Sequence, residues 1–180
     1  MLRTALFLLA LVSPTLAADT VRTEAARLRF SVPAAWTRVP APSDFRAAQL
    51  KIPRTAEDKE DGSLVLYHFG EGKGGGVEEN LDRWYGQFTQ PDGRPSRDAA
   101  VITMKTVNQL RVTAVDLSGT YQGMGMGGAK DAAKPGYRML AAVVEGEGGP
   151  WFWKAIGPEV TLAGAKSGFD AMLASLEAHR

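Results

Sequence analysis

The chain has few side chains that could act as a nucleophile, a general base or a metal ligand. Its 180 residues include no Cys, which excludes a thiolate nucleophile, a thiolate metal site and a disulfide framework. There are two histidines, His68 and His179, and no Gly-x-Ser-x-Gly or His-Glu-x-x-His motif. His68 shares its predicted strand face with Leu64 and Leu66, which favours a hydrogen-bonded core histidine. A hydrolase that pairs His68 with a carboxylate is kept as an alternative.

A glycine-rich stretch follows the strand that carries His68. The spacing Gly70-x-Gly72-x-x-Gly75 has the form of the dinucleotide-binding fingerprint, but no alternation of strands and helices follows it. We therefore favour a flexible strand-to-helix connection in which the glycines adopt positive φ. A small anion at the N-terminus of the next helix is the alternative, with Lys73 as the only nearby cation. This makes Gly72, Lys73 and Gly75 candidate binding residues.

Three polar residues form a stripe on the helix expected after this stretch. Asn80, Arg83 and Gln87 are spaced i, i+3 and i+7, beside an apolar stripe that contains Trp84 and Phe88. If the helix covers the sheet, the polar stripe lies at its shoulder. There the three side chains either cap loop carbonyls or face a partner, and we count them as candidate binding residues.

The metal-binding patterns are incomplete. Met124 and Met126 place two thioethers close together in a glycine-rich loop, an arrangement that could bind cuprous copper but has no histidine nearby. The acidic segment 57–62 resembles the start of a calcium loop. With Gly62 at the sixth position, however, Lys59 falls on a ligand position and His68 on the twelfth, where a bidentate Glu belongs. We expect no metal and no cofactor, and we interpret the methionine loop as a partner-binding candidate.

The N-terminus has the pattern of an export signal. A positive start at Arg3 precedes an apolar stretch over residues 5–12, and small residues end at Ala17. The sequence predicts a signal peptide over residues 1–17 and a mature chain that begins at Ala18. Loss of Arg3 leaves 20 basic residues (21 minus 1) against 20 acidic ones, so the mature chain has no net charge. A nucleic-acid partner and an anionic membrane surface are therefore not expected, and no membrane span remains after cleavage.

Hydropathy periods predict one α+β domain over residues 27–180, preceded by a flexible segment over residues 18–26. Segments with a period of two residues are expected to be strands, and segments with a helical period are expected to be helices. Their order is three strands, a helix, four strands and a helix. This order favours a mostly antiparallel sheet of about seven strands with two packing helices. The expected strands cover residues 27–32, 45–52, 63–69, 101–107, 110–117, 137–144 and 151–156, and the expected helices cover 77–88 and 162–176. Asn108-Gln109 is expected to form a tight hairpin turn. Trp151 and Trp153 are expected on one face of their strand and Phe152 on the other.

This order of elements and four local phrases resemble proteins of the PsbP-like fold and uncharacterised exported bacterial proteins. The phrases are Phe30-x-x-Pro33-x-x-Trp36, Ala48-Gln49-x-x-Ile52-Pro53, Asn80-x-x-Arg83-Trp84-x-x-Gln87-Phe88 and Gly136-Tyr137-Arg138-Met139-Leu140. PsbP-like proteins are generally not enzymes, so the resemblance implies a binding or assembly-accessory role. It carries over no functional residue, because no functional motif matches residue by residue.

Together these features predict an exported, non-catalytic protein of the bacterial periplasm, the cell envelope or the extracellular space. It would bind a protein partner or a small ligand there. The alternatives are a small-ligand or metal-binding module and the hydrolase built on His68. The sequence leaves the oligomeric state and the identity of the partner open.

Overall fold

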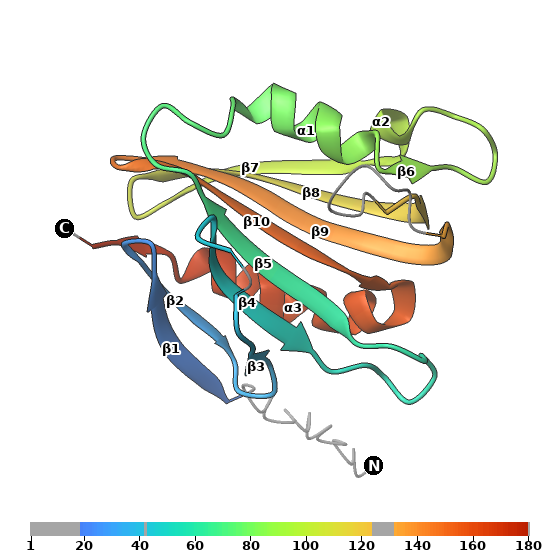
Figure 1. Ribbon diagram of the computed structural model, residues 1–180, viewed down its shortest axis with the longest axis horizontal. Coiled ribbons are helices and arrows are strands. Elements are labelled where there is room, and N and C mark those ends of the chain that lie inside the picture. Colours follow the sequence, from blue (N-terminus) through green and yellow to red (C-terminus); the bar gives the residue numbers. More distant parts are fainter. Residues whose placement is uncertain (1–18, 42, 124–131, 180) are drawn as a thin grey trace, which may run out of the picture.

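The computed structural model describes residues 19–41, 43–123 and 132–179. The expected signal peptide over residues 1–17 lies outside the described residues, and so do Met124 and Met126. A large antiparallel sheet crosses the molecule, with a small second sheet at one side and helices on both faces (Figure 1). None of the helices in the described ranges has the length and apolar character needed to cross a membrane.

The large sheet has eight strands, and all of its pairings are antiparallel. The strands are β3 (Thr37–Arg38), β4 (Arg46–Ile52), β5 (Gly62–His68), β6 (Phe88–Thr89), β7 (Val101–Val107), β8 (Leu110–Tyr121), β9 (Lys134–Gly146) and β10 (Gly149–Pro158). Their order is β3-β4-β5-β10-β9-β8-β6, and β7 also pairs with β8. The small sheet has the order β1-β2-β11, formed by β1 (Thr20–Ala25), β2 (Leu28–Pro33) and β11 (Glu177–Ala178). The helices are α1 (Val77–Tyr85), α2 (Ser96–Ala99) and α3 (Glu159–Ala174).

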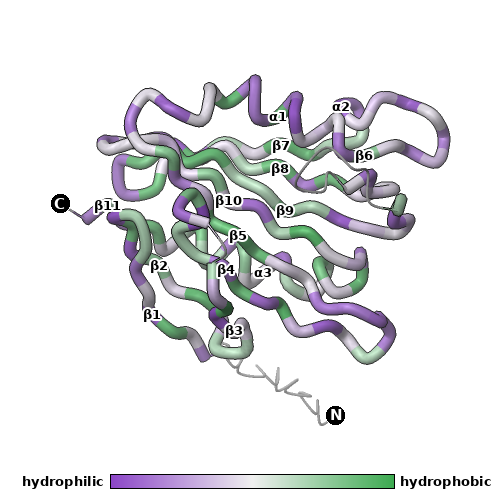
Figure 2. Tube along the Cα trace, viewed as in Figure 1, coloured by the Kyte–Doolittle hydropathy of each residue, from purple (hydrophilic) through white to green (hydrophobic). Residues whose placement is uncertain are grey.

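Alternation along the central strands gives the domain two hydrophobic cores, one on each face of the large sheet. On β10, Trp151 and Trp153 pack with α3 and β2, whereas Phe152 packs with α1 on the opposite face. This follows from the period of two residues in a strand, and it confirms the facing predicted for the three aromatic residues. Figure 2 shows hydrophobic residues along the strands, while much of α1 is hydrophilic.

The predicted seven strands and two helices are all present, so the α+β class and the mostly antiparallel sheet are confirmed. The structure adds β1, β3, β6, β11 and α2, and two of these additions change what was expected of a segment. The segment expected to be flexible over residues 18–26 contains β1, because its backbone pairs with β2 from Thr20↔Pro33 to Ala25↔Leu28. The helix expected to reach Phe88 ends at Tyr85, since Phe88 instead pairs with Tyr121 of β8.

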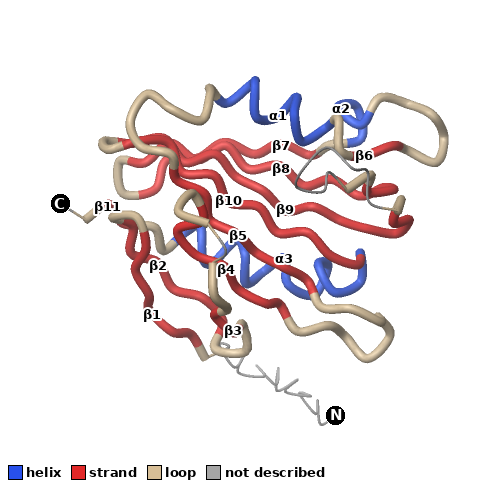
Figure 3. The backbone as a smooth tube through the Cα atoms, in the orientation of Figure 1, coloured by secondary structure: helices blue, strands red, loops and turns tan. Residues whose placement is uncertain are grey.

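Several turns that are far apart in sequence gather at one end of the molecule, which we call the turn end. They are the β1–β2 turn at Ala26-Arg27, the β7–β8 turn at Asn108-Gln109, the β9–β10 turn and the connection 70–76. Figure 3 shows these loops on the side of the molecule where the C-terminal strand β11 lies. The non-glycine residues with positive φ in the described chain all occur here, at Ala26, Arg27, Asn108 and Gln109. The tight hairpin predicted at Asn108-Gln109 is confirmed, with φ angles of 47° and 70°.

Gln109→Gly is expected to stabilise the protein. Gln109 is exposed and adopts φ 70°, a conformation that costs a side-chain-bearing residue about 1–2 kcal/mol and costs Gly almost nothing. We expect the free energy of unfolding in urea to rise by about 1 kcal/mol, because Asn-Gly is the preferred pair for this turn. Lys105→Gly, in the middle of exposed β7, is the control and should lower that free energy. A loss of stability in Gln109→Gly would contradict this description of the turn.

Candidate functional site

The connection 70–76 is tied to α1 by a buried asparagine. Asn80, which is 3% exposed, donates from Nδ2 to the carbonyl oxygens of Gly74 at 3.0 Å and Gly76 at 2.8 Å. Arg83 donates from Nη1 to Asn80 Oδ1 at 2.9 Å, so both ends of the amide group have partners. Asn80 therefore binds loop carbonyls, the first of the two roles predicted for the polar stripe. It fixes the position of the glycine-rich connection relative to the helix.

The N-terminus of α1 already faces carboxylates of the chain itself. Glu78 and Glu79 lie in its first turn, and the Glu79 carboxylate lies so close to Gly75 that a Cβ added there would clash with it. Acidic groups are favourable at this positive end of the helix, where a bound anion had been the alternative. Gly72 and Gly75 have positive φ, as expected for a glycine-rich connection, and Lys73 is exposed.

A cleft opens at the turn end between the connection 70–76 and the sheet. Its first part has a volume of about 510 Å³ and is lined by this connection, by Gln109 and Arg111, and by the β9–β10 hairpin. A second cavity of about 420 Å³ shares Gln109 and Gly146 with the first and extends toward Arg27 and the end of β11. We call the two together the turn-end cleft. The cleft brings together Gly72 and Gly75 from the candidate residues, but not Asn80, Arg83 or Gln87.

The lining of the turn-end cleft has more acidic than basic groups. Four carboxylates, Glu71, Glu145, Glu147 and Glu177, and two guanidinium groups, Arg27 and Arg111, line the two cavities. Arg111 and Glu145 form an ion pair with 2.9 Å between Nη2 and Oε1. Glu177 pairs with Arg22, which lies outside the cleft lining. In the described structure the side chains of Glu71 and Glu147 are exposed and have no hydrogen-bond or ion-pair partner, so they are available to a ligand.

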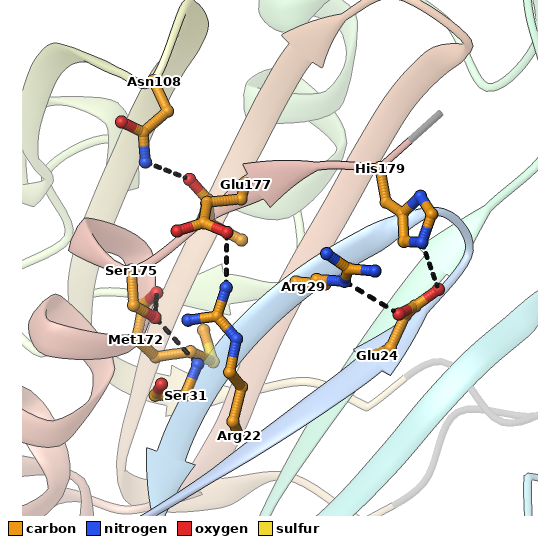
Figure 4. A network of polar contacts seen from close by, with 10 residues as sticks. Arg22, Glu24, Arg29, Ser31, Asn108, Met172, Ser175, Glu177 and His179 are labelled. Atoms are coloured by element: carbon orange, nitrogen blue, oxygen red, sulfur yellow. Dashed lines mark hydrogen bonds and ion pairs between the residues drawn. The ribbon is translucent and has the colours of Figure 1, made fainter.

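Polar contacts hold the C-terminal strand in the wall of the second cavity. Asn108 donates from Nδ2 to the carbonyl oxygen of Leu176 at 2.9 Å, which connects the β7–β8 turn to the residue before β11 (Figure 4). His179 Nε2 lies 4.0 Å from Glu24 Oε1, and the backbone N–H of His179 donates to the Arg27 carbonyl at 2.8 Å. These contacts join elements from both sheets and so fix the shape of the wall.

His68 supports the wall of the cleft from behind. Its Nδ1 lies 3.3 Å from the Pro150 carbonyl oxygen, and its ring stacks on Trp151 with 5.4 Å between ring centroids. Gly149 leaves room for this ring, because a Cβ added to Gly149 would lie 2.5 Å from His68 Cε1. His68 forms no ion pair with a carboxylate in the described residues, and no group of three or more potential metal ligands occurs among them. Its environment is that of a half-buried, hydrogen-bonded histidine.

Gln87 has a partner that the sequence did not predict. It is buried, and it accepts a hydrogen bond from the Nζ of Lys154 on β10. Nζ of Lys154 also lies 5.8 Å from the centroid of the Tyr121 ring. Burial lowers the pKa of Lys154 from 10.5 to about 8. The sequence feature that could have indicated this contact is that Lys154 is the one charged residue in the otherwise apolar segment 149–158.

The β8 and β9 side of the cleft was also missing from the predicted site. Arg111 and Glu145 are directly opposite each other in the β8–β9 ladder, which places their side chains on the same face. Neither residue belongs to a motif. Only knowledge of the strand pairing could have brought them together.

Loss of the Asn80 side chain should destabilise the connection 70–76. In Asn80→Ala the Gly74 carbonyl loses its side-chain donor, and the Gly76 carbonyl keeps only the backbone N–H of residue 80 at 3.2 Å. We expect the free energy of unfolding in urea to fall by about 1–3 kcal/mol. Hydrogen exchange should also become faster in this connection. Glu78→Ala is the matched control on the same helix, and its effect should stay below about 1 kcal/mol because Glu78 is exposed in the first turn, where it contributes only through the helix dipole. Equal effects of the two substitutions would show that Asn80 has no special role.

Lys154 should make stability depend on pH between 8 and 10. Its folded pKa of about 8 lies below the 10.5 of the unfolded chain, so the unfolded state binds more protons in this range and stability rises with pH. Burial raises the pKa of Tyr85 and Tyr137, and both phenols are also present in Lys154→Met, so the comparison with that variant isolates the lysine. Relative to Lys154→Met, the unmodified protein should gain about 2 kcal/mol from pH 8 to pH 10 in urea unfolding. Parallel pH profiles of the two proteins would contradict the assignment.

Comparisons with known proteins establish the fold and nothing finer. No protein-family model and no curated protein matches the chain. The solution structure of cyanobacterial PsbP from Synechocystis is similar, with a TM-score of 0.53, 14% identity, and coverage of 95% of this chain and 99% of that one. A protein of unknown function from Pseudomonas aeruginosa has a TM-score of 0.51 and 10% identity, covering 91% and 99% of the two chains. A Bacteroides thetaiotaomicron protein has a TM-score of 0.50 and 12% identity, covering 91% and 49%. The chain has a PsbP-like fold, as its sequence predicted.

Proposed function

We propose that this chain is an exported, non-catalytic binding protein that takes a small polar ligand with a cationic group in the turn-end cleft. The observation that carries the proposal is the cavity of about 510 Å³, with the adjoining cavity of about 420 Å³. Volumes of this size are typical of small-molecule sites. The turns that form the walls are held by Asn80 and Asn108, so the cleft is preformed.

The charges of the cleft favour a cationic ligand over an anionic one. Arg111 is paired with Glu145, and Glu177 with Arg22, so the remaining charges of the lining are the carboxylates of Glu71 and Glu147 and the guanidinium group of Arg27, an excess of one negative charge. Glu71 and Glu147 can each accept hydrogen bonds from an ammonium or guanidinium group. Arg111, held by Glu145, and the amide of Gln109 supply further polar contacts that would orient the ligand. A small amine or guanidine compound fits this arrangement.

The non-catalytic part of the proposal is supported by the environment of His68. Its Nδ1 is engaged with the Pro150 carbonyl and its ring stacks on Trp151. No carboxylate contacts the ring in the described residues, so the pair that a hydrolase would need is not formed there. Export is supported by the pattern of residues 1–17, with its basic start, apolar stretch and small residues before Ala18.

The test compares two glycine substitutions of equal size. Gly76 lines the cleft, has φ −80°, and leaves open space where a Cβ would go, so Gly76→Phe should fill the cleft without straining the backbone. Gly164 on α3 also faces open space, and Gly164→Phe is the matched control outside the cleft. Melting temperatures are measured with putrescine, agmatine and lysine, and with succinate and phosphate as anionic probes. The protein is purified from the periplasm of an expressing bacterium, where its mass should match a chain beginning at Ala18.

We expect at least one amine to raise the melting temperature of the unmodified protein and of Gly164→Phe, but not of Gly76→Phe, because ligand binding to the folded state stabilises it by mass action. No shift with any amine, a shift that persists in Gly76→Phe, or a shift with the anions alone would overturn the proposed site. Absence of the protein from the periplasm would overturn the proposed export.

A further inference from the structure

Strand β7 exposes apolar side chains on both of its faces. Val101, Ile102 and Met104 are 62%, 44% and 80% exposed, and residues 101–106 are all exposed. The other exposed large hydrophobic residues, Val21, Phe45 and Val160, lie on three separate segments. This grouping on one strand is unusual for a surface that faces only water.

The backbone of β7 also has a free edge. β7 pairs with β8 and with no other strand of the described chain. Val107 and Leu110 flank the two-residue turn and form the hydrogen-bonded pair that closes the hairpin. Because hydrogen-bonding direction alternates along a strand, the N–H and C=O groups of Ile102, Met104 and Thr106 point away from β8. Three consecutive donor-acceptor sites therefore lie open on this edge.

The remaining edges of the two sheets carry the protections that natural proteins use against edge pairing. β3, β6 and β11 have two residues each. On β1, Arg22 and Glu24 are both engaged in ion pairs across the small sheet. β7 has seven residues, no Pro and one charge, at Lys105, so it differs from these four edge strands.

We propose that β7 pairs antiparallel with β7 of a second copy of this chain, about a twofold axis at Met104. In this register Met104 faces Met104 of the second copy, and Ile102 faces Thr106. The outward N–H and C=O groups of Ile102, Met104 and Thr106 are then all hydrogen-bonded on each copy. A twofold axis at any other residue of β7 would leave at least one of the three residues without a partner. The pairing joins two eight-stranded sheets into one continuous sheet, with the two turn ends pointing in opposite directions.

The one charge on β7 is well placed in this register. Lys105 of the second copy comes opposite Thr103, on the face where Thr103 borders a small groove that also contains Asp116, Lys166 and Asp170. Asp116 is already paired with Arg138, and Asp170 with Lys166, so the charges around this groove are balanced. Lys105 therefore lies opposite Thr103, beside a charge-balanced groove, and not opposite the Lys105 of the other copy.

Cysteine cross-linking tests the register, because the natural chain contains no Cys. Met104→Cys places the new thiol opposite its own copy, at a Cα separation of about 5.5 Å, which a disulfide can span. Ile102→Cys is the control, since its two copies would lie four residues apart along the strands, about 13 Å. Under mild oxidation we expect Met104→Cys to give at least about ten times more covalent dimer than Ile102→Cys. Equal cross-linking of the two variants, or none, would overturn the proposal.

Sedimentation of the unmodified protein up to about 1 mM gives an independent readout. We expect a monomer–dimer equilibrium that Met104→Lys shifts toward monomer, because the substitution brings two like charges face to face. Val21→Lys, at an exposed site on β1, should leave the equilibrium unchanged. A protein that stays monomeric at every concentration, or a dimer that Met104→Lys leaves intact, would overturn the proposal.

Discussion

The alternation of side chains along β9 and β10 is the constraint on which the rest of the structure depends. Trp151 and Trp153 fill the core under α3, and Phe152 fills the core under α1. Since the period of a strand is two residues, a slip of one position would move the tryptophans to the α1 face and place Lys154 in the core under α3. The register of β10 with β5 and β9 is therefore fixed, and with it the position of each turn.

The turn-end cleft is a consequence of that register. Arg111 lies opposite Glu145 in the β8–β9 ladder, and the β9–β10 turn is placed beside the connection 70–76. α1 must lie over Phe152, so the chain between β5 and α1 has to cross the end of the sheet. Gly74 allows this close crossing, because a Cβ there would lie 2.5 Å from the Phe152 ring, and Asn80 fixes the crossing chain to the helix. The core and the candidate site are thus parts of one arrangement.

Much of the fold could be predicted from the sequence, because periods of hydropathy report local structure. The apolar alternation that ends at Pro33 correctly predicted β2, and Asn108-Gln109 correctly predicted the β7–β8 turn. β1 was missed because Thr20–Ala25 contains mostly polar residues, and its strand is stabilised by pairing with β2 rather than by apolar alternation. The site was predicted only on its glycine-rich side. Arg111, Glu145 and Lys154 acquire their roles from strand pairing and burial, which no local pattern in one sequence records.

The proposed function depends most directly on where a ligand binds. Backbone amide chemical shifts of the ¹⁵N-labelled protein, recorded while an amine that raises its melting temperature is added, would locate the site. Binding in the turn-end cleft predicts shifts concentrated in the connection 70–76, at Gln109 and Arg111, and in the β9–β10 turn, with the amides of α3 unchanged. Shifts centred on Lys154 and Tyr121, or spread evenly over the surface, would contradict it.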